Sequence, residues 1–113
     1  MHELSLCESV LKIIEDEVAR QGFTRVRKVW LEIGELSSAE PEAMRFCFKA
    51  VTDGTVANGA ELEILRPPGQ AWCMTCSKTV EVSQRFDPCP VCGGYQLQVT
   101  GGDQLRIKEL EVD

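Results

Sequence analysis

Two Cys-x-x-Cys pairs constrain the fold of this chain more than any other feature. Cys73 and Cys76 form the first pair, Cys89 and Cys92 form the second, and twelve residues separate the pairs. Two residues between cysteines allow both thiolates of a tight turn to point at one ion, and two such turns complete the tetrahedron that zinc favours. Gly93 follows the second pair, where a positive φ suits the turn. The spacing therefore predicts a zinc ribbon with a short hairpin between its turns.

The predicted zinc is structural. Four thiolates fill the coordination shell of the ion and leave no open position for a water molecule. The main chemical rival is iron in a rubredoxin-like site, because Cys-Pro-x-Cys-Gly turns serve both metals. A thioredoxin-like redox pair needs only one Cys-x-x-Cys and a βαβ setting, which the sequence lacks.

The hydrophobic pattern outside the ribbon predicts an α+β domain of two helices and three strands. Apolar residues spaced by three and four predict helices, and alternating apolar residues predict strands. The helices are expected over residues 4–21 and from Pro41 to about Gly54, and the strands over residues 25–34, 60–66 and 104–112. The apolar residues of the last strand change parity midway, which predicts a bulge.

The chain is expected to divide into two domains. Residues 71–100 hold four of the six cysteines but few large apolar residues, so this stretch has too little core to fold by burial alone. The prolines and glycine of residues 67–69 precede it as a rigid connector, and residues 101–103 follow it as a turn. We expect one domain of residues 1–70 plus 101–113, with residues 71–100 inserted as the ribbon.

The chain has 113 residues and a net charge of -6, which suits cations or a basic partner better than nucleic acid. No run approaches the roughly 20 apolar residues that span a bilayer, and charges interrupt the N-terminal stretch where a signal peptide would lie. We therefore expect a cytoplasmic protein with reduced cysteines and no nucleic-acid or membrane partner. Cys7 and Cys47 lie on the apolar faces of the predicted helices as core residues, and Trp30 and Trp72 are expected to pack.

The only histidine of the chain, His2, lies beside the N-terminal amine. Because methionine removal favours small second residues, Met1 is expected to stay in place. The Met1 amine, the His2 amide nitrogen and His2 Nδ1 can then close a five-membered and a six-membered chelate ring. Nickel(II) and copper(II) favour such planar nitrogen sites. A terminal histidine is more often a solvated residue, and the fourth ligand is open among Glu3, Glu40, water and a partner group.

Four further stretches complete a pattern with the cysteine turns. They are Met1-His2-Glu3-Leu4-Ser5-Leu6-Cys7, Trp30-Leu31-Glu32-Ile33-Gly34, Phe46-Cys47-Phe48 and Leu105-Arg106-Ile107-Lys108. The pattern covers essentially the whole chain and resembles the hydrogenase maturation factor family HypA/HybF. The resemblance implies a nickel metallochaperone, in which residues 1–70 plus 101–113 form the nickel-binding domain.

The resemblance also implies sites and partners. It implies a transported nickel ion held by the Met1 amine, His2 and nearby groups such as Glu3, and a structural zinc on the four ribbon cysteines. It implies cooperation with a HypB-type GTPase and delivery to the large subunit of a [NiFe]-hydrogenase, while some relatives also serve urease maturation. The chain could be a monomer or a homodimer.

Two other classes of function compete with this interpretation. A zinc-ribbon module that serves protein interaction or nucleic acid, without a nickel role, should carry basic residues around its cysteines. Here Lys78 and Arg85 are balanced by Glu81 and Asp87. An enzyme is not expected, because the sequence has no Ser-His-Asp set, glycine-rich phosphate loop or open metal triad.

Overall fold

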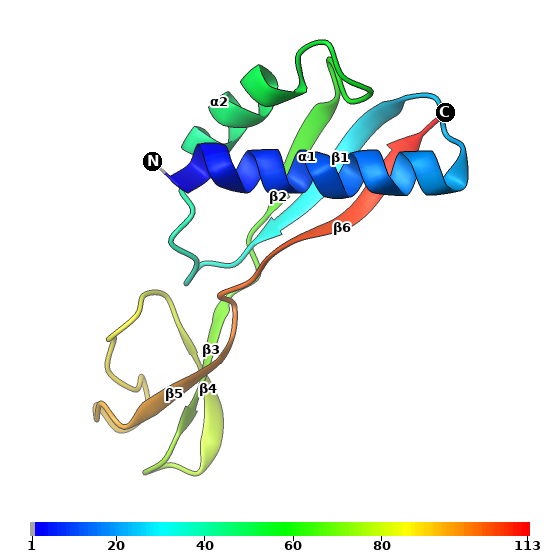
Figure 1. The fold of residues 1–113 in the computed structure, drawn as a ribbon. Helices are drawn as coiled ribbons and strands as arrows, with labels where there is room; N and C mark the ends of the chain where they lie inside the picture. Colours follow the sequence, from blue (N-terminus) through cyan, green and yellow to red (C-terminus); the bar gives the residue numbers. More distant parts are fainter. Residues whose placement is uncertain (1) are drawn as a thin grey trace. The chain divides into compact units, whose positions relative to one another are not determined.

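The computed structural model describes residues 2–113, and within them the chain is of the predicted α+β class. Its elements are α1 (His2–Gln21), β1 (Val26–Ile33), α2 (Pro41–Thr52), β2 (Glu61–Leu65), β3 (Gly69–Cys73), β4 (Lys78–Val82), β5 (Leu97–Gly101) and β6 (Leu105–Val112) (Figure 1). The strands form two three-stranded sheets, one in the order β2-β1-β6 and the other in the order β4-β3-β5. The sequence predicted the strands of the first sheet and only a hairpin for the second.

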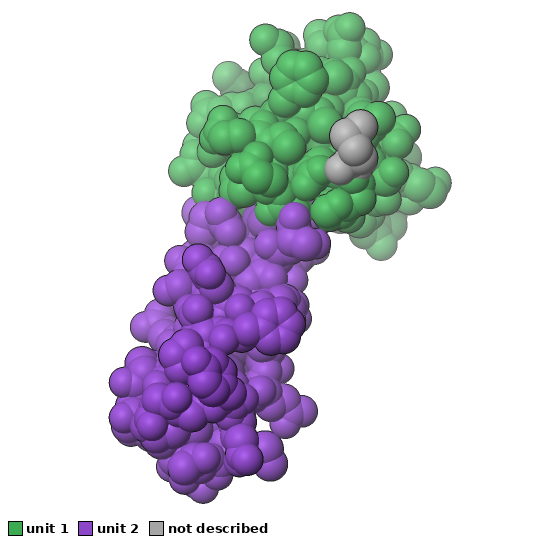
Figure 2. Space-filling model, turned by 90° about the vertical axis from the view of Figure 1, so that its left-hand side faces the viewer, with its two compact units in different colours: residues 1–31, 39–64, 106–113 green, residues 32–38, 65–105 purple. Residues whose placement is uncertain are grey.

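The described residues separate into two compact units (Figure 2). One unit holds the chain up to Leu31 together with Ala39–Ile64 and Arg106–Asp113, and the other holds Glu32–Ser38 and Leu65–Leu105. The second unit is larger than the expected 71–100 ribbon, because it takes in all of β3 and the segment that follows β1. The expected domains, 1–70 plus 101–113 and 71–100, stay a prediction about which parts fold independently.

Helix α1 of the first unit buries one apolar stripe. Cys7, Val10, Ile14 and Val18 recur at helical spacing and are all buried. The helix ends where Gly22 adopts a φ of 75° and its N–H donates to the Val18 carbonyl at 2.9 Å, which is the predicted glycine cap. The helix begins two residues earlier than expected, so His2 and Glu3 belong to its first turn.

Helix α2 begins at Pro41, as predicted. Glu40 is its N-cap residue, and the Glu40 carboxylate accepts a hydrogen bond from the Ala43 N–H at 2.8 Å. Met44 and Phe48 are buried, and Met44 contacts Cys7 of α1. The N-cap therefore fixes where the chain turns into α2 and, with it, the position of Glu40.

The first sheet carries the β6 strand on one edge. Backbone bonds join Asp113 to Arg25 and Gly34 to Gln104, each at 2.9 Å, so β6 runs antiparallel to β1. Both strands span the same number of residues between these bonds, so the pairing has no net extra residue, and the predicted bulge within β6 stays a prediction. The half-buried residues of β6 change parity between Ile107 and Leu110, as the apolar pattern of the sequence does.

The second sheet packs one face over the cysteine turns. Ala71 of β3 lies opposite Val80 of β4 and Val99 of β5, and a register shift falls between Gln70 and Ala71. The buried residues of this face and its surroundings form one cluster: Leu36, Ala71, Cys73, Val80, Val82 and Cys89. Leu36 is the only leucine among these buried residues, so the small sheet gains its largest buried side chain from the segment after β1.

Backbone segments of the second unit cross at a point where only glycine fits. A Cβ added to Gly34 would collide with the carbonyl of Gly102, and a Cβ added to Gly102 would collide with the carbonyl of Pro68. Hydrogen bonds from the Leu36 N–H to Gly102 at 2.8 Å and from Glu35 to Pro67 at 3.0 Å hold the crossing together. The glycines thus allow three segments distant in sequence to approach backbone to backbone.

Candidate metal centres

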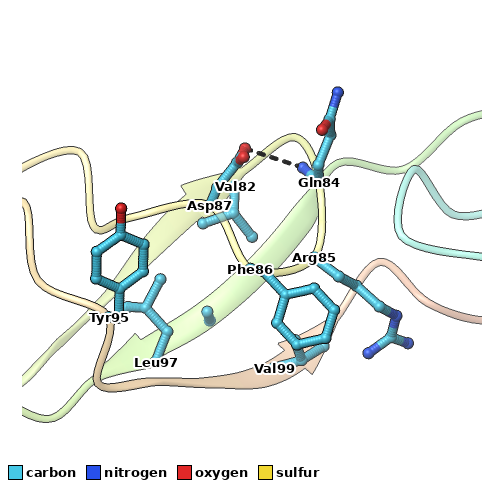
Figure 3. A pocket seen from close by; sticks show the side chains of 9 residues that line it. Val82, Gln84, Arg85, Phe86, Asp87, Tyr95, Leu97 and Val99 are labelled. Carbon is cyan, nitrogen blue, oxygen red and sulfur yellow. Dashed lines mark hydrogen bonds between the residues drawn. The ribbon is translucent and has the colours of Figure 1, made fainter.

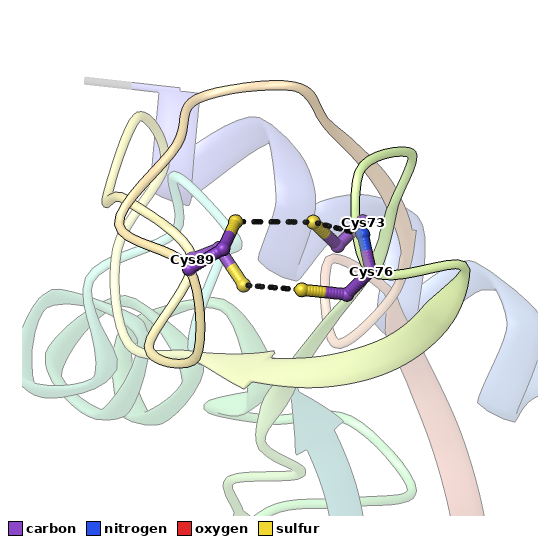
Figure 4. A group of neighbouring side chains, drawn as sticks. Cys73, Cys76 and Cys89 are labelled. Atoms are coloured by element: carbon purple, nitrogen blue, oxygen red, sulfur yellow. Dashed lines mark hydrogen bonds between the residues drawn. The ribbon is translucent and has the colours of Figure 1, made fainter.

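The four ribbon cysteines converge on one point (Figure 4). Their sulfur atoms all lie within 4.8 Å of one another, with 3.7 Å between Cys73 and Cys92 and 4.0 Å between Cys76 and Cys89. Tetrahedral zinc with bonds of about 2.3 Å places two ligand sulfurs roughly 3.8 Å apart. The cluster is therefore consistent with a structural zinc site, as the Cys-x-x-Cys spacing predicted.

The local backbone orients these sulfurs. The Cys76 N–H donates to the Cys73 sulfur and the Val91 N–H donates to the Cys89 sulfur, each at 3.4 Å. Gly93 has the predicted positive φ of 75°, but its N–H closes the turn on the Cys89 carbonyl at 2.8 Å instead of reaching sulfur. The N–H groups of Cys76 and Val91, which do donate to sulfur, stabilise thiolate charge beside a metal.

Without a metal ion, the four ribbon thiols do not all ionise at neutral pH. Backbone N–H donors, first that of Cys92, lower the pKa of the Cys89 thiol to about 6. Partial burial and the neighbouring thiols raise the pKa of Cys76 to about 12. A bound dication offsets the repulsion among four thiolates, so binding of zinc releases protons and holds the two turns together.

An apolar hollow of about 180 Å³ opens on the second unit (Figure 3). Its lining includes Ala71, Val82, Leu97 and Val99, with Phe86 and Tyr95 exposed at its rim. The nearby Arg85 guanidinium lies 3.7 Å from the Asp103 carboxylate, which offsets its charge. This part of the ribbon is therefore apolar and not basic.

The candidate nickel ligands gather where α1 begins and α2 is capped. The structure places His2 and Glu3 in the first turn of α1, and the Glu40 N–H donates to the Glu3 carboxylate at 3.2 Å. This hydrogen bond lowers the pKa of the Glu3 carboxyl, so Glu3 is ionised at neutral pH. Met1, whose amine is the remaining predicted ligand, lies outside the described residues.

The structure thus brings the backbone of Glu40, one of the open choices for the fourth ligand, beside Glu3, which follows His2 in the sequence. The side chains of His2, Glu3 and Glu40 do not form a cluster with metal-binding geometry within residues 2–113. Sequence reasoning did not foresee that Glu40 serves α2 and Glu3 at once, through its side chain and its backbone. The signal was present in the sequence, since an acidic residue directly before a proline at a helix start is a candidate N-cap.

Cys7 and Cys47 lie outside the ribbon. Cys7 is fully buried and Cys47 is half-buried, so the expectation of a core residue is confirmed for Cys7 and met only partly for Cys47. The four ribbon cysteines are the only group of three or more His, Cys, Asp or Glu side chains within residues 2–113 that has metal-binding geometry. In the same residues, no helix has the length and apolar character to cross a bilayer.

Comparison with known proteins gives one consistent result. The family model described as "Hydrogenase/urease nickel incorporation, metallochaperone, hypA" matches residues 1–112. Hydrogenase maturation factor HypA of Rhodopseudomonas palustris (strain BisA53) is 65% identical, and HypA 2 of Bradyrhizobium diazoefficiens is 58% identical, each over 100% of both chains. The fold is similar to the solution structure of the Ni metallochaperone HypA from Helicobacter pylori, with a TM-score of 0.71 at 23% identity over 99% of this chain and 97% of that one. The chain therefore belongs to the HypA family of metallochaperones for nickel incorporation into hydrogenase and urease.

Proposed function

We propose that this chain carries nickel(II) at the start of α1 and delivers it to a [NiFe]-hydrogenase during maturation. One observation carries the proposal: the first turn of α1 presents His2 and Glu3 directly beside Glu40, the residue that caps α2. The family supports nickel handling as the role, and this arrangement supports the start of α1 as the place where the ion binds.

The proposed ligands are the Met1 amine, the His2 amide nitrogen and His2 Nδ1, with Glu3 and Glu40 as candidates for the fourth ligand. Nickel(II) favours a planar set of this kind. A metal that displaces an amide proton in the first helical turn leaves the i→i−4 hydrogen bonds of α1 intact, because these begin further along. The chelate can therefore form without unwinding the helix.

The helix start also favours release of the ion. The positive end of the α1 dipole repels a cation, and the carboxylates of Glu3 and Glu40 offset that repulsion only locally. A site with few anchors at the end of a chain can give up its ion to a partner, whereas four thiolates on one ion cannot do so easily. We propose that nickel is the cargo and zinc on Cys73, Cys76, Cys89 and Cys92 is the permanent structural ion.

The partners we propose are a HypB-type GTPase and the large subunit of a [NiFe]-hydrogenase, in the cytoplasm. The family role in hydrogenase maturation supports contact with the maturation machinery. None of the six cysteines is paired in a disulfide within residues 2–113, which suits a reducing compartment. We propose a carrier and not an enzyme, and neither nucleic acid nor a membrane as a partner.

The experiment is complementation of cells that lack their own copy of the chain. We expect His2→Ala to abolish hydrogenase maturation at limiting nickel while the zinc content of the purified variant stays unchanged. Glu8→Gln, which alters an exposed acidic residue of the same helix, is the matched control and should mature hydrogenase normally. Full maturation by His2→Ala would refute the proposed nickel site.

A further inference from the structure

Two buried sulfur-bearing side chains meet where α1 packs against α2. Cys7 and Met44 are both 0% exposed, and the Cys7 sulfur lies 3.9 Å from the Met44 sulfur. The Cys7 thiol also lies 3.4 Å from the Met44 carbonyl oxygen. Cys47 follows Met44 by three residues on α2 and is half-buried, so the two share one side of that helix.

The spacing of the two buried sulfurs suits a shared ion. With metal–sulfur bonds of about 2.3 Å, two sulfurs on one ion lie between roughly 3.8 Å in a tetrahedral arrangement and 4.6 Å in a linear one. The observed 3.9 Å between Cys7 and Met44 falls within this range. The described structure therefore already holds these two donors at ligand spacing.

The chemistry of the donors selects the ion. A thiolate and a thioether are soft ligands that select Cu(I) over hard cations. One monovalent ion bound to the Cys7 thiolate forms a neutral pair, which a buried site can accommodate, whereas a divalent ion would leave a net charge there. On binding, the metal–sulfur bond replaces the S–H bond of Cys7, the proton leaves to solvent, and no electron is transferred.

We propose that the Cys7 thiolate and the Met44 thioether form a binding site for Cu(I), separate from the nickel and zinc sites. Copper(II) binds nitrogen ligands more tightly than nickel does, so copper is the natural competitor for a nickel chaperone. In a reducing compartment copper is monovalent, and a sulfur site would hold it away from the nitrogen ligands of the chain's start.

The experiment is an anaerobic titration of the zinc-loaded full chain with Cu(I) buffered by bathocuproine disulfonate, while a chromogenic dye reports zinc release. We expect the first Cu(I) to bind without release of zinc. Met44→Leu, which removes one sulfur at similar volume, should weaken this site by at least about tenfold, the lower end of what loss of a supporting group costs a metal site. Cys7→Ala should remove it.

Two controls isolate the site. Met74→Leu makes the same chemical change at an exposed position between the zinc ligands Cys73 and Cys76, so its zinc content is measured first; with zinc bound it should bind Cu(I) as the unaltered chain does. His2→Ala should lose nickel binding and still bind Cu(I). A failure of the nickel proposal and a failure of the copper proposal therefore give different results. The proposal fails if the first Cu(I) displaces zinc, or if Met44→Leu and Cys7→Ala both bind Cu(I) with unchanged affinity.

Discussion

The backbone N–H of Glu40 donates to the Glu3 carboxylate at 3.2 Å, so the residue that caps α2 also holds the first turn of α1. These residues are 37 positions apart, so the contact joins the start of α1 to the N-cap of α2. It restricts the Glu3 side chain, while the Glu40 carboxylate accepts from the Ala43 N–H. We propose the nickel site at this junction.

The first prediction concerns the acidity of Glu3. Because the Glu40 N–H favours the charged carboxylate, the pKa of Glu3 should lie below the ordinary 4.5. The contact then stabilises the fold at pH values above the ordinary pKa, and that contribution is lost as the pH falls through the lowered one. Carbon NMR of the Glu3 carboxyl checks this. A Glu3 pKa at or above 4.5 in the folded chain would show that the contact is absent in solution.

The second prediction concerns zinc. Metal analysis of the purified chain should find a single zinc and no iron, and Cys89→Ser should lose it, since a four-thiolate shell does not survive loss of a buried ligand. The thiol at Cys47 is the matched control, because it lies outside the ribbon, so Cys47→Ser should retain the zinc. Iron in the native chain, or zinc retained by Cys89→Ser at full affinity, would contradict the assignment of this site.

The third prediction concerns the backbone crossing of the second unit. Gly34→Ala should lower the free energy of unfolding by about 2–4 kcal/mol, because the added methyl collides with the Gly102 backbone, which cannot rotate away. Gly54→Ala should cost only about 1 kcal/mol, since its Cβ meets open space and the penalty comes from its positive φ alone. Urea unfolding of both variants measures the difference. Equal losses would mean that the crossing is looser than described.

The fourth prediction concerns the reactivity of Cys7. Burial and the nearby Cys47 raise the pKa of the Cys7 thiol to about 11, so little thiolate exists at pH 8. Alkylation of Cys7 by iodoacetamide in the folded chain should be slower than in the urea-unfolded chain by roughly 100-fold or more, since the thiolate is the nucleophile. Peptide mass spectrometry follows the rate. Similar rates in both states would show that α1 and α2 open readily.

Much of the fold follows from local pattern. The stripe of Cys7, Val10, Ile14 and Val18 predicted α1, Pro41 predicted the start of α2, and the spacing of the ribbon cysteines predicted their convergence. These features depend on residues close in sequence or on chemistry that one metal imposes on four thiols, so sequence alone carries them.

The features missed depend on long-range pairing. Strand β3 begins at Gly69, which the sequence assigned to a connector, and strand β5 ends at Gly101, which it assigned to a turn. Pairing between the two strands overrode these local signals. Trp72 was expected to pack, yet it is 41% exposed, because the alternation of β3 turns Ala71 and Cys73 inward. The role of Leu36 in the second core and of Met44 beside Cys7 likewise arises from contacts that no local period encodes.

We propose that nickel binds through the first nitrogens of the chain. The most direct measurement is a nickel(II) titration of the zinc-loaded chain, of His2→Ala and of the control Glu8→Gln, followed by the absorption band of planar nickel(II). We expect the band for the unaltered chain and for Glu8→Gln, and its loss in His2→Ala with zinc still bound. An identical band and affinity in His2→Ala would contradict nickel binding through these nitrogens.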